Sequence, residues 1–245
     1  MKAVGIIPAR YGSVRFPGKA LADLLGKPLI QWVYERAKES GSLERVIVAT
    51  DDQRIVDAVN SFGGDVELTS PNHTSGTERV AEVAKRLDSD LVVNIQGDQP
   101  LVEPRAIDSL VYATLDSPQV EIGTLIAQSK DEDELKNPNV VKVVFDRRGF
   151  ALYFSRHPIP WPGYPRSNPR ETTFYKHIGV YAYKRDALVR LADLPPSPLE
   201  MAEGLEQLRA LENGLGIKVV ETPYPSWSVD TKEDLTRVER LLSSP

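Results

Sequence analysis

The sequence has no cysteine and only three histidines among its 245 residues. The absence of cysteine excludes disulfides and thiolate chemistry, and three histidines without cysteine make a zinc site unexpected. No apolar run approaches the roughly 20 residues that a membrane span requires. The N-terminal residues also lack the basic, apolar and small-residue succession of a secretory signal peptide. We therefore expect a protein with no membrane span that works in the cytoplasm.

An excess of basic residues is also missing. Thirty lysine and arginine residues stand against 35 aspartate and glutamate residues, so the formal net charge is -5 at pH 7. This balance argues against nucleic acid as a partner. A phosphate-bearing ligand must therefore be bound by positively charged side chains that are close together at its site. Because 41% of the residues are hydrophobic, the chain can bury a sizeable core. We expect residues 1–245 to form a single α/β domain.

The first half of the sequence alternates apolar strands with helices. A helix is predicted over residues 28–40, because proline stands in its first turn and Gly41 follows as a stop, and another over residues 52–62. The predicted strands are residues 1–8, 45–50, 66–68 and 90–95. This alternation is typical of a mostly parallel sheet flanked by helices, with right-handed crossovers and a ligand cleft at the carboxyl ends of the strands.

The pattern changes after about Asn137. Residues 140–145 and 150–155 flank an Asp-Arg-Arg-Gly turn, which predicts a β-hairpin. The proline-rich residues 158–169 come next, and they cannot form a helix or a central strand. We expect the apolar side chains of this excursion to be covered by a second copy of the chain in a homodimer. Further elements are predicted as a strand at 175–183, a helix from Pro198, a strand at 217–221 and a helix from Lys232.

The most informative motif follows the first strand. Residues 5–19 read Gly-Ile-Ile-Pro-Ala-Arg-Tyr-Gly-Ser-Val-Arg-Phe-Pro-Gly-Lys, so an apolar strand leads into a loop with two glycines and the cations Arg10, Arg15 and Lys19. Glycines let backbone amides approach anionic oxygens and the cations offset their charge, which predicts a polyphosphate site. The loop is not a Walker A motif, because Ala20 stands where that motif has a magnesium-binding serine or threonine.

Two aspartates follow predicted strands or strand-like runs. Asp98 stands in Gln-Gly-Asp-Gln after strand 90–95, where a carboxylate can hold Mg²⁺ against phosphate oxygens, or can simply form a turn. Asp230 stands in Ser-Val-Asp-Thr-Lys-Glu-Asp-Leu at residues 228–235. On the residues alone, Asp230 or Thr231 can cap the last helix.

A third polar segment, Thr-Ser-Gly-Thr-Glu-Arg at residues 74–79, opens a helix. Ser75 or Thr74 can cap that helix, and Glu78 stands at capping-box distance from Ser75. The pattern by itself therefore has a purely structural interpretation. His73 and His157 are interpreted as structural residues.

The string Ile-Pro-Ala-Arg-x-x-Ser-x-Arg-x-Pro-Gly-Lys at residues 7–19 resembles the opening signature of the sugar nucleotidyltransferases. In this form it is similar to the 3-deoxy-manno-octulosonate cytidylyltransferase family, also called CMP-Kdo synthetases. The resemblance runs from Ile7 to Leu235, with the motifs in the family's order. It implies a nucleotide-diphospho-sugar transferase-like (Rossmann-like) fold, with residues 138–185 at the acceptor site and the dimer interface.

The resemblance also implies the roles of individual residues. Asp98 and Asp230 become a pair of Mg²⁺ ligands, and the catalytic set is Arg10, Arg15, Lys19, Asp98 and Asp230. The implied nucleotide-binding residues are Pro8, Ala9, Arg10, Ser13, Lys19, Thr74, Ser75, Gly76, Arg79 and Gln96. The implied sugar-acid-binding residues are Arg156, His177, Glu206 and Gln207. Alternatives remain for two of these, since His177 can be a core residue and Glu206 can belong to a solvated helix face.

The implied function is transfer of CMP from CTP to the anomeric hydroxyl of 3-deoxy-D-manno-octulosonate (Kdo), with release of pyrophosphate, for lipopolysaccharide biosynthesis. One alternative is a cytidylyltransferase for another sugar acid such as sialic acid. A glycosyltransferase would need an Asp-x-Asp motif after a strand, whereas Asp131-Glu132-Asp133 opens a charged helical segment. A nucleotide-sensing module without turnover is the alternative outside enzymology.

Overall fold

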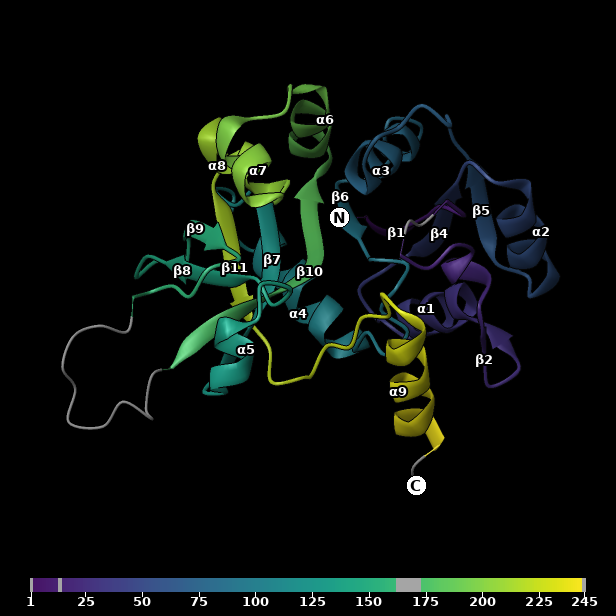
Figure 1. Cartoon of the computed structure of the whole chain (residues 1–245). Coiled ribbons are helices and arrows are strands. Elements are labelled where there is room, and N and C mark those ends of the chain that lie inside the picture. Colours follow the sequence, from purple (N-terminus) through teal and green to yellow (C-terminus); the bar gives the residue numbers. More distant parts are fainter. Residues whose placement is uncertain (1, 13–14, 162–172, 244–245) are drawn as a thin grey trace.

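The computed structural model describes residues 2–12, 15–161 and 173–243, in which strands and helices alternate through the first half of the chain (Figure 1). The strands are β1 Ala3–Ala9, β2 Asp23–Leu24, β3 Lys27–Pro28, β4 Arg45–Thr50, β5 Asp65–Leu68, β6 Leu91–Asn94, β7 Ile122–Ser129, β8 Lys142–Phe145, β9 Ala151–Ser155, β10 Phe174–Lys184 and β11 Ile217–Glu221. The α-helices are α1 Leu29–Lys38, α2 Gln53–Ser61, α3 Gly76–Ala84, α4 Pro104–Leu115, α5 Glu132–Lys136, α6 Arg185–Asp193, α7 Pro198–Glu203, α8 Gln207–Glu212 and α9 Lys232–Ser243, and a 3₁₀ helix, η1, spans Lys19–Leu21.

One sheet passes through both halves of the described chain. Its order is β11-β7-β10-β6-β1-β4-β5, and β8 and β9 extend it from β10. Strands β6, β1, β4 and β5 run parallel to one another, whereas β10 is antiparallel to both β6 and β7. The carboxyl ends of β1, β4 and β6 therefore meet at the same edge, as the sequence predicts.

Helices cover the two faces of this sheet because alternate strand residues point to opposite sides. Ile7 of β1 and Val93 of β6 share a core with residues of α1, α2 and α4. Ile6 and Val92 point the other way, into a core with residues of α3, α6 and α8. The α/β fold class predicted from the sequence is confirmed.

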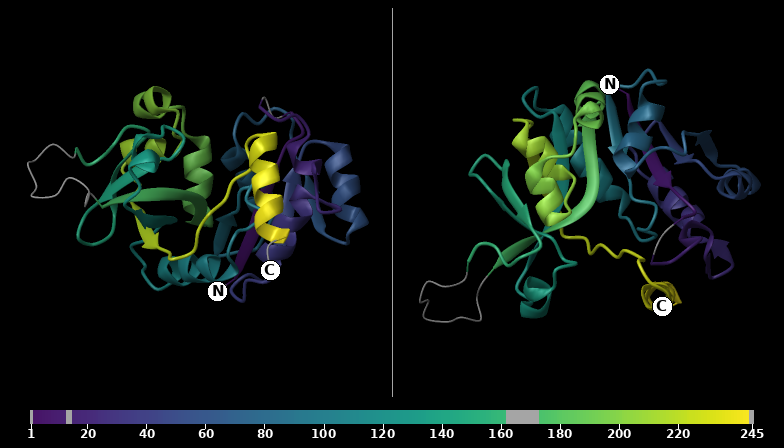
Figure 2. Two further views of the ribbon diagram at one scale, coloured as in Figure 1. Left: turned by 60° about the horizontal axis from the view of Figure 1, so that its bottom comes forward. Right: turned by 45° about the horizontal axis from the view of Figure 1, so that its top comes forward.

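The last helix crosses back to the first half of the molecule. After β11, the chain runs to α9, which lies beside the α1 region in each view (Figure 2). Val229 and Val238 are buried there with Phe16, Leu24 and Leu29. The packing of α9 thus joins the C-terminal segment to the loop that follows β1.

The second half agrees with the sequence in part. The hairpin is present as β8 and β9, and β10 includes the predicted strand, but the antiparallel direction of β10 was not predicted. Residues 162–172 of the proline-rich excursion lie outside the described residues. No helix of the described chain is long and apolar enough to cross a membrane.

Candidate active site

A pocket of about 350 Å³ opens at the carboxyl ends of β1 and β6 and at the start of α3. This volume lies within the range of small-molecule sites in proteins. The lining residues are Pro8, Ala9, Arg10, Arg15, Lys19, Ala20, His73, Thr74, Ser75, Gly76, Arg79, Gln96, Gly97, Asp98 and Asp230. The structure thus brings together the predicted nucleotide-binding and catalytic residues from four distant segments, apart from Ser13, which lies outside the described residues.

The loop after β1 is closed by a backbone hydrogen bond. The Gly18 amide donates to the Tyr11 carbonyl at 2.9 Å, and Gly18 has a φ of 72°, which a residue with a side chain rarely adopts. The Tyr11 ring covers Gly18 on one side, and the Arg54 guanidinium lies 3.3 Å from the centre of that ring. Lys19 begins η1 directly after this turn, so the closed loop fixes where its ammonium group points.

A second glycine lets the β6 loop approach the β1 loop. A Cβ atom added at Gly97 would lie 2.8 Å from the Pro8 carbonyl oxygen, closer than a real side chain tolerates. The absence of a side chain at Gly97 therefore allows Asp98 to reach the pocket beside the end of β1.

Opposite charges meet where these loops converge. The Lys19 ammonium lies 2.8 Å from Asp98 Oδ2 and 3.3 Å from Asp230 Oδ1. The Arg15 guanidinium lies 2.9 Å from the same oxygen of Asp230. The Lys19 side chain is only 14% exposed, so its charge is screened less by water than the charge of the exposed Arg15. Lys19 is thus the group that neutralises both carboxylates.

The start of α9 shows which of residues 230 and 231 caps the helix. The Thr231 hydroxyl accepts from the Asp234 amide at 3.2 Å, and the Asp234 carboxylate accepts from the amides of Asp230 and Thr231. This reciprocal pair is a capping box. Because Thr231 is the cap, the Asp230 side chain is left to face Lys19.

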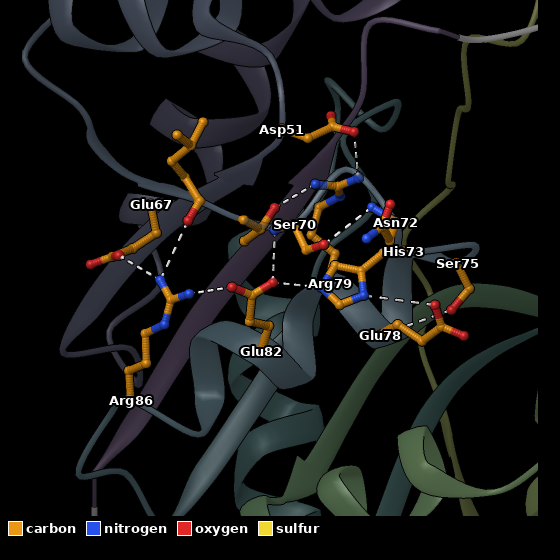
Figure 3. Close-up of polar contacts among 12 residues, drawn as sticks. Asp51, Glu67, Ser70, Asn72, His73, Ser75, Glu78, Arg79, Glu82 and Arg86 are labelled. Carbon is orange, nitrogen blue, oxygen red and sulfur yellow. Dashed lines mark hydrogen bonds and ion pairs between the residues drawn. The ribbon is translucent and has the colours of Figure 1, made fainter.

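The start of α3 forms another wall of the pocket. The Ser75 hydroxyl caps this helix by accepting from the Glu78 amide at 3.2 Å, as the sequence predicts. The Arg79 side chain is 4% exposed and lies 3.0 Å from Asp51 Oδ2 (Figure 3). It also donates to the Thr69 hydroxyl. These bonds hold the buried guanidinium at the wall of the pocket.

Two of the predicted sugar-acid residues belong to a polar network on the other side of α3. Glu206 accepts a 2.6 Å hydrogen bond from the Thr77 hydroxyl. The His177 ring packs between Phe154 and Tyr181, and its Nε2 lies 3.0 Å from the Thr124 hydroxyl. Burial lowers the pKa of His177 to about 3, so this imidazole is neutral and suited to hydrogen bonding rather than to charge pairing.

The other two predicted sugar-acid residues are held by their surroundings. The Arg156 guanidinium donates to the carbonyls of Glu203, Pro138 and Gly204, so it joins segments that surround β9. The Gln207 side chain is buried, and its amide nitrogen has no hydrogen-bond partner among the described residues. None of the four lines the pocket described above, and their binding role stays a prediction.

Two aromatic residues in this network were missed at the sequence level. Tyr181 and Tyr183 stack with their ring centres 5.6 Å apart. Burial, followed by the charge of the nearby Glu206, raises the pKa of Tyr183 well above its ordinary value, which keeps the phenol protonated as a donor. Their two-residue spacing along the predicted strand was the available signal, since such residues share one face of a strand.

The chain matches the family model described as Cytidylyltransferase over residues 4–220. It is 51% identical to a 3-deoxy-manno-octulosonate cytidylyltransferase of Geobacter metallireducens, over 99% of this chain and 98% of that protein. It is 52% identical to the protein of the same name from Syntrophotalea carbinolica, over 99% of each.

Solved structures agree with these relatives. The structure of a CMP:2-keto-3-deoxy-manno-octonic acid synthetase complexed with CTP matches with a TM-score of 0.93 at 43% identity, over 99% of both chains. A cytidylyltransferase of Leptospira borgpetersenii matches with a TM-score of 0.65 at 20% identity, which shows the fold alone. With its β1 loop, its paired aspartates and its α3 segment in one pocket, this chain belongs to the cytidylyltransferase family, among relatives named 3-deoxy-manno-octulosonate cytidylyltransferase.

Proposed function

We propose that this protein transfers CMP from CTP to the anomeric hydroxyl of Kdo and releases pyrophosphate, as a step toward lipopolysaccharide. The observation that carries the proposal is the convergence of Lys19, Asp98 and Asp230 in one pocket. The names of the full-length relatives and the CTP complex of a similar structure support both substrates. The hydroxyl oxygen forms a bond to the α-phosphorus of CTP while the bond to the pyrophosphate oxygen breaks.

Orientation and charge neutralisation supply the catalysis, because the reaction needs no covalent enzyme intermediate. Arg10, Arg15 and Lys19 face the triphosphate and stabilise the leaving pyrophosphate. The cytosine is bound by Thr74, Ser75 and Gly76, and Arg79 supports this segment. A purine would need more room, and a base with other hydrogen-bonding groups would leave polar atoms of this wall unpaired.

Asp98 and Asp230 suit a divalent cation. Both carboxylates lie within 3.3 Å of the same Lys19 nitrogen, so they are close enough to share one ion. Among the described residues no group of three histidine, cysteine or acidic side chains is placed to hold a metal, and Mg²⁺ commonly takes only one or two protein carboxylates together with phosphate and water. Bound Mg²⁺ would polarise the α-phosphate and lower the pKa of the attacking hydroxyl.

The acceptor side consists of the network around Glu206 and His177, with Arg156 and Gln207 beside it. A neutral imidazole, a carboxylate and protonated phenols can hydrogen-bond the hydroxyls of a sugar. Arg156 holds the segments that carry this network. Residues 138–185 are therefore proposed to frame the acceptor.

The free edge of β9 supports the proposal of a homodimer. Within the described residues β9 pairs only with β8, and Leu152 on it is 63% exposed. Trp161 and Met201 are 79% and 68% exposed. An open strand edge with exposed apolar side chains is suited to a second copy of the chain.

The proposed reaction is tested by pyrophosphate release from CTP with a panel of sugar acids. We expect Kdo to give the highest kcat/KM, with sialic acid far below it. Release with sialic acid but not with Kdo would identify the alternative acceptor. A protein that binds CTP and releases no pyrophosphate with any sugar acid would be a nucleotide-sensing module.

The aspartate pair is tested with Asp98→Asn, Asp230→Asn and the double variant. Each asparagine keeps the volume and removes one charge, so we expect kcat to fall by roughly 100-fold or more. The double variant should be scarcely worse than either single one, because the two carboxylates act as one unit. The measurement is pyrophosphate release across a magnesium titration.

Asp65→Asn, on the exposed edge strand β5, is the matched control. Near wild-type turnover of Asp230→Asn at saturating magnesium would contradict the paired mechanism.

Thr77 tests the acceptor network, because its hydroxyl holds Glu206 at 2.6 Å. Thr77→Val keeps the shape and removes this donor, which is worth about 1.5–3 kcal/mol when the partner is charged. We expect KM for Kdo to rise by about tenfold or more, with KM for CTP nearly unchanged. Thr77→Ser retains the hydroxyl and should restore the wild-type value. Equal KM values for Kdo in the valine and serine variants would exclude Glu206 from the acceptor site.

Sedimentation velocity at micromolar concentration tests the dimer. We expect the wild-type protein to sediment as two chains and Leu152→Lys as one, because a buried lysine without a partner is costly at an interface. Leu68→Lys changes another exposed leucine, on β5, and should leave the dimer intact. A wild-type protein that sediments as a monomer would overturn this proposal.

A further inference from the structure

His73 lines the nucleotide pocket, although its sequence pattern predicts only a structural role. It lies in the loop between β5 and α3, directly before the Thr74–Ser75–Gly76 segment. The proposed roles of the triphosphate loop and of the aspartate pair do not involve this imidazole.

The His73 ring lies between two carboxylates of α3 (Figure 3). Its Nε2 lies 2.5 Å from Glu82 Oε2, and its Nδ1 lies 3.8 Å from Glu78 Oε2. Although burial acts to raise it, bonds from the Ser70 amide and from His73 keep the pKa of Glu82 below its ordinary value. An ionised carboxylate can only accept, so Nε2 carries a proton and donates it.

The same two carboxylates fasten the loop at both ends. Glu82 accepts from the Ser70 amide at 2.9 Å, and Glu78 accepts from the Thr74 amide at 2.7 Å and from its hydroxyl at 3.0 Å. Glu78 and Glu82 lie one turn apart on α3, where like charges repel. The His73 ring lies between these two carboxylates. It bonds Glu82, which holds the Ser70 end of the loop.

We propose that His73 is a positioning residue for recognition of the base. Its imidazole keeps Glu78 and Glu82 in the orientation that fixes residues 70–76 against the pocket. The proposal rests on the proposed function insofar as the Thr74–Gly76 segment reads cytosine. It assigns His73 no contact with the triphosphate.

Two substitutions separate hydrogen bonding from packing. His73→Phe keeps a planar ring and loses both nitrogens, whereas His73→Gln loses the ring and places an amide near the Nε2 position. We expect His73→Phe to raise KM for CTP by about tenfold, the loss typical of one hydrogen bond to a charged group. The value of kcat should stay within about twofold, and His73→Gln should recover most of the affinity for CTP.

Inorganic tripolyphosphate serves as the probe of the triphosphate loop. Its inhibition constant should be the same in wild type and His73→Phe, because the β1 loop does not contact His73 in any described interaction. Glu67→Gln is the matched control, since Glu67 lies beyond Arg86 at the exposed end of the same chain of charges (Figure 3). This control should leave every constant unchanged.

The inference would be overturned if His73→Phe behaved as wild type while His73→Gln lost affinity, because the ring would then act by packing. Equal weakening of CTP and tripolyphosphate would also overturn it, since the whole pocket would have loosened. Should the phenylalanine variant not fold, His73→Asn, which cannot reach Glu82 in the same way, is expected to show the same rise. Calorimetric titration with CTP alone decides the role of His73 even if the wild-type protein released no pyrophosphate with Kdo.

Discussion

The site depends on one ammonium group between two carboxylates. Lys19 lies 2.8 Å from Asp98 and 3.3 Å from Asp230, and these residues come from three loops far apart in the sequence. Two carboxylates at such a place repel each other. Lys19 offsets this repulsion and holds the loops at a common point. The Lys19 side chain is largely buried and the Arg15 side chain is exposed, so Lys19 is the less solvated of the two cations at this centre.

Apolar packing brings the second carboxylate to that centre. Asp230 follows Val229, which is fully buried in the cluster formed with Phe16 and Leu24. The Val229 amide donates to the Asp98 carbonyl at 2.8 Å, so the segment before α9 is also tied to the loop after β6. The hydrophobic contact and the backbone bond position the aspartate, and the charges then determine its orientation. The return of the chain from β11 across the molecule to α9 thus places Asp230 beside Asp98 and Lys19.

Much of this arrangement could be predicted from local sequence. The β1 strand and its glycine loop, the Ser75 cap and the strand before Asp98 follow from patterns within a dozen residues, and the parallel order places their ends together. Long-range contacts were not accessible in this way. The role of Asp230 could not be decided, because only the structure reveals that Thr231 is the cap. Tyr181 and Tyr183 were missed because burial on an antiparallel β10 depends on its neighbours β6 and β7. Helix α6 has no side-chain cap and depends on packing against the sheet, whereas α4 begins at Pro104 after the capping side chain of Glu103, a start signal that was not used.

The first turn of α3 connects the two halves of the proposed reaction. Ser75 and Gly76 line the nucleotide pocket, while the next residue, Thr77, bonds Glu206 on the acceptor side. Helix geometry places successive residues about 100° apart, so neighbours in one turn face different directions. Thr77 thus turns away from the pocket and toward Glu206. Because one helix start carries both contacts, in the proposed reaction it would position both a base bound against Ser75 and a sugar acid bound by Glu206. The distance between the attacking hydroxyl and the α-phosphate in the proposed reaction would then depend on α3.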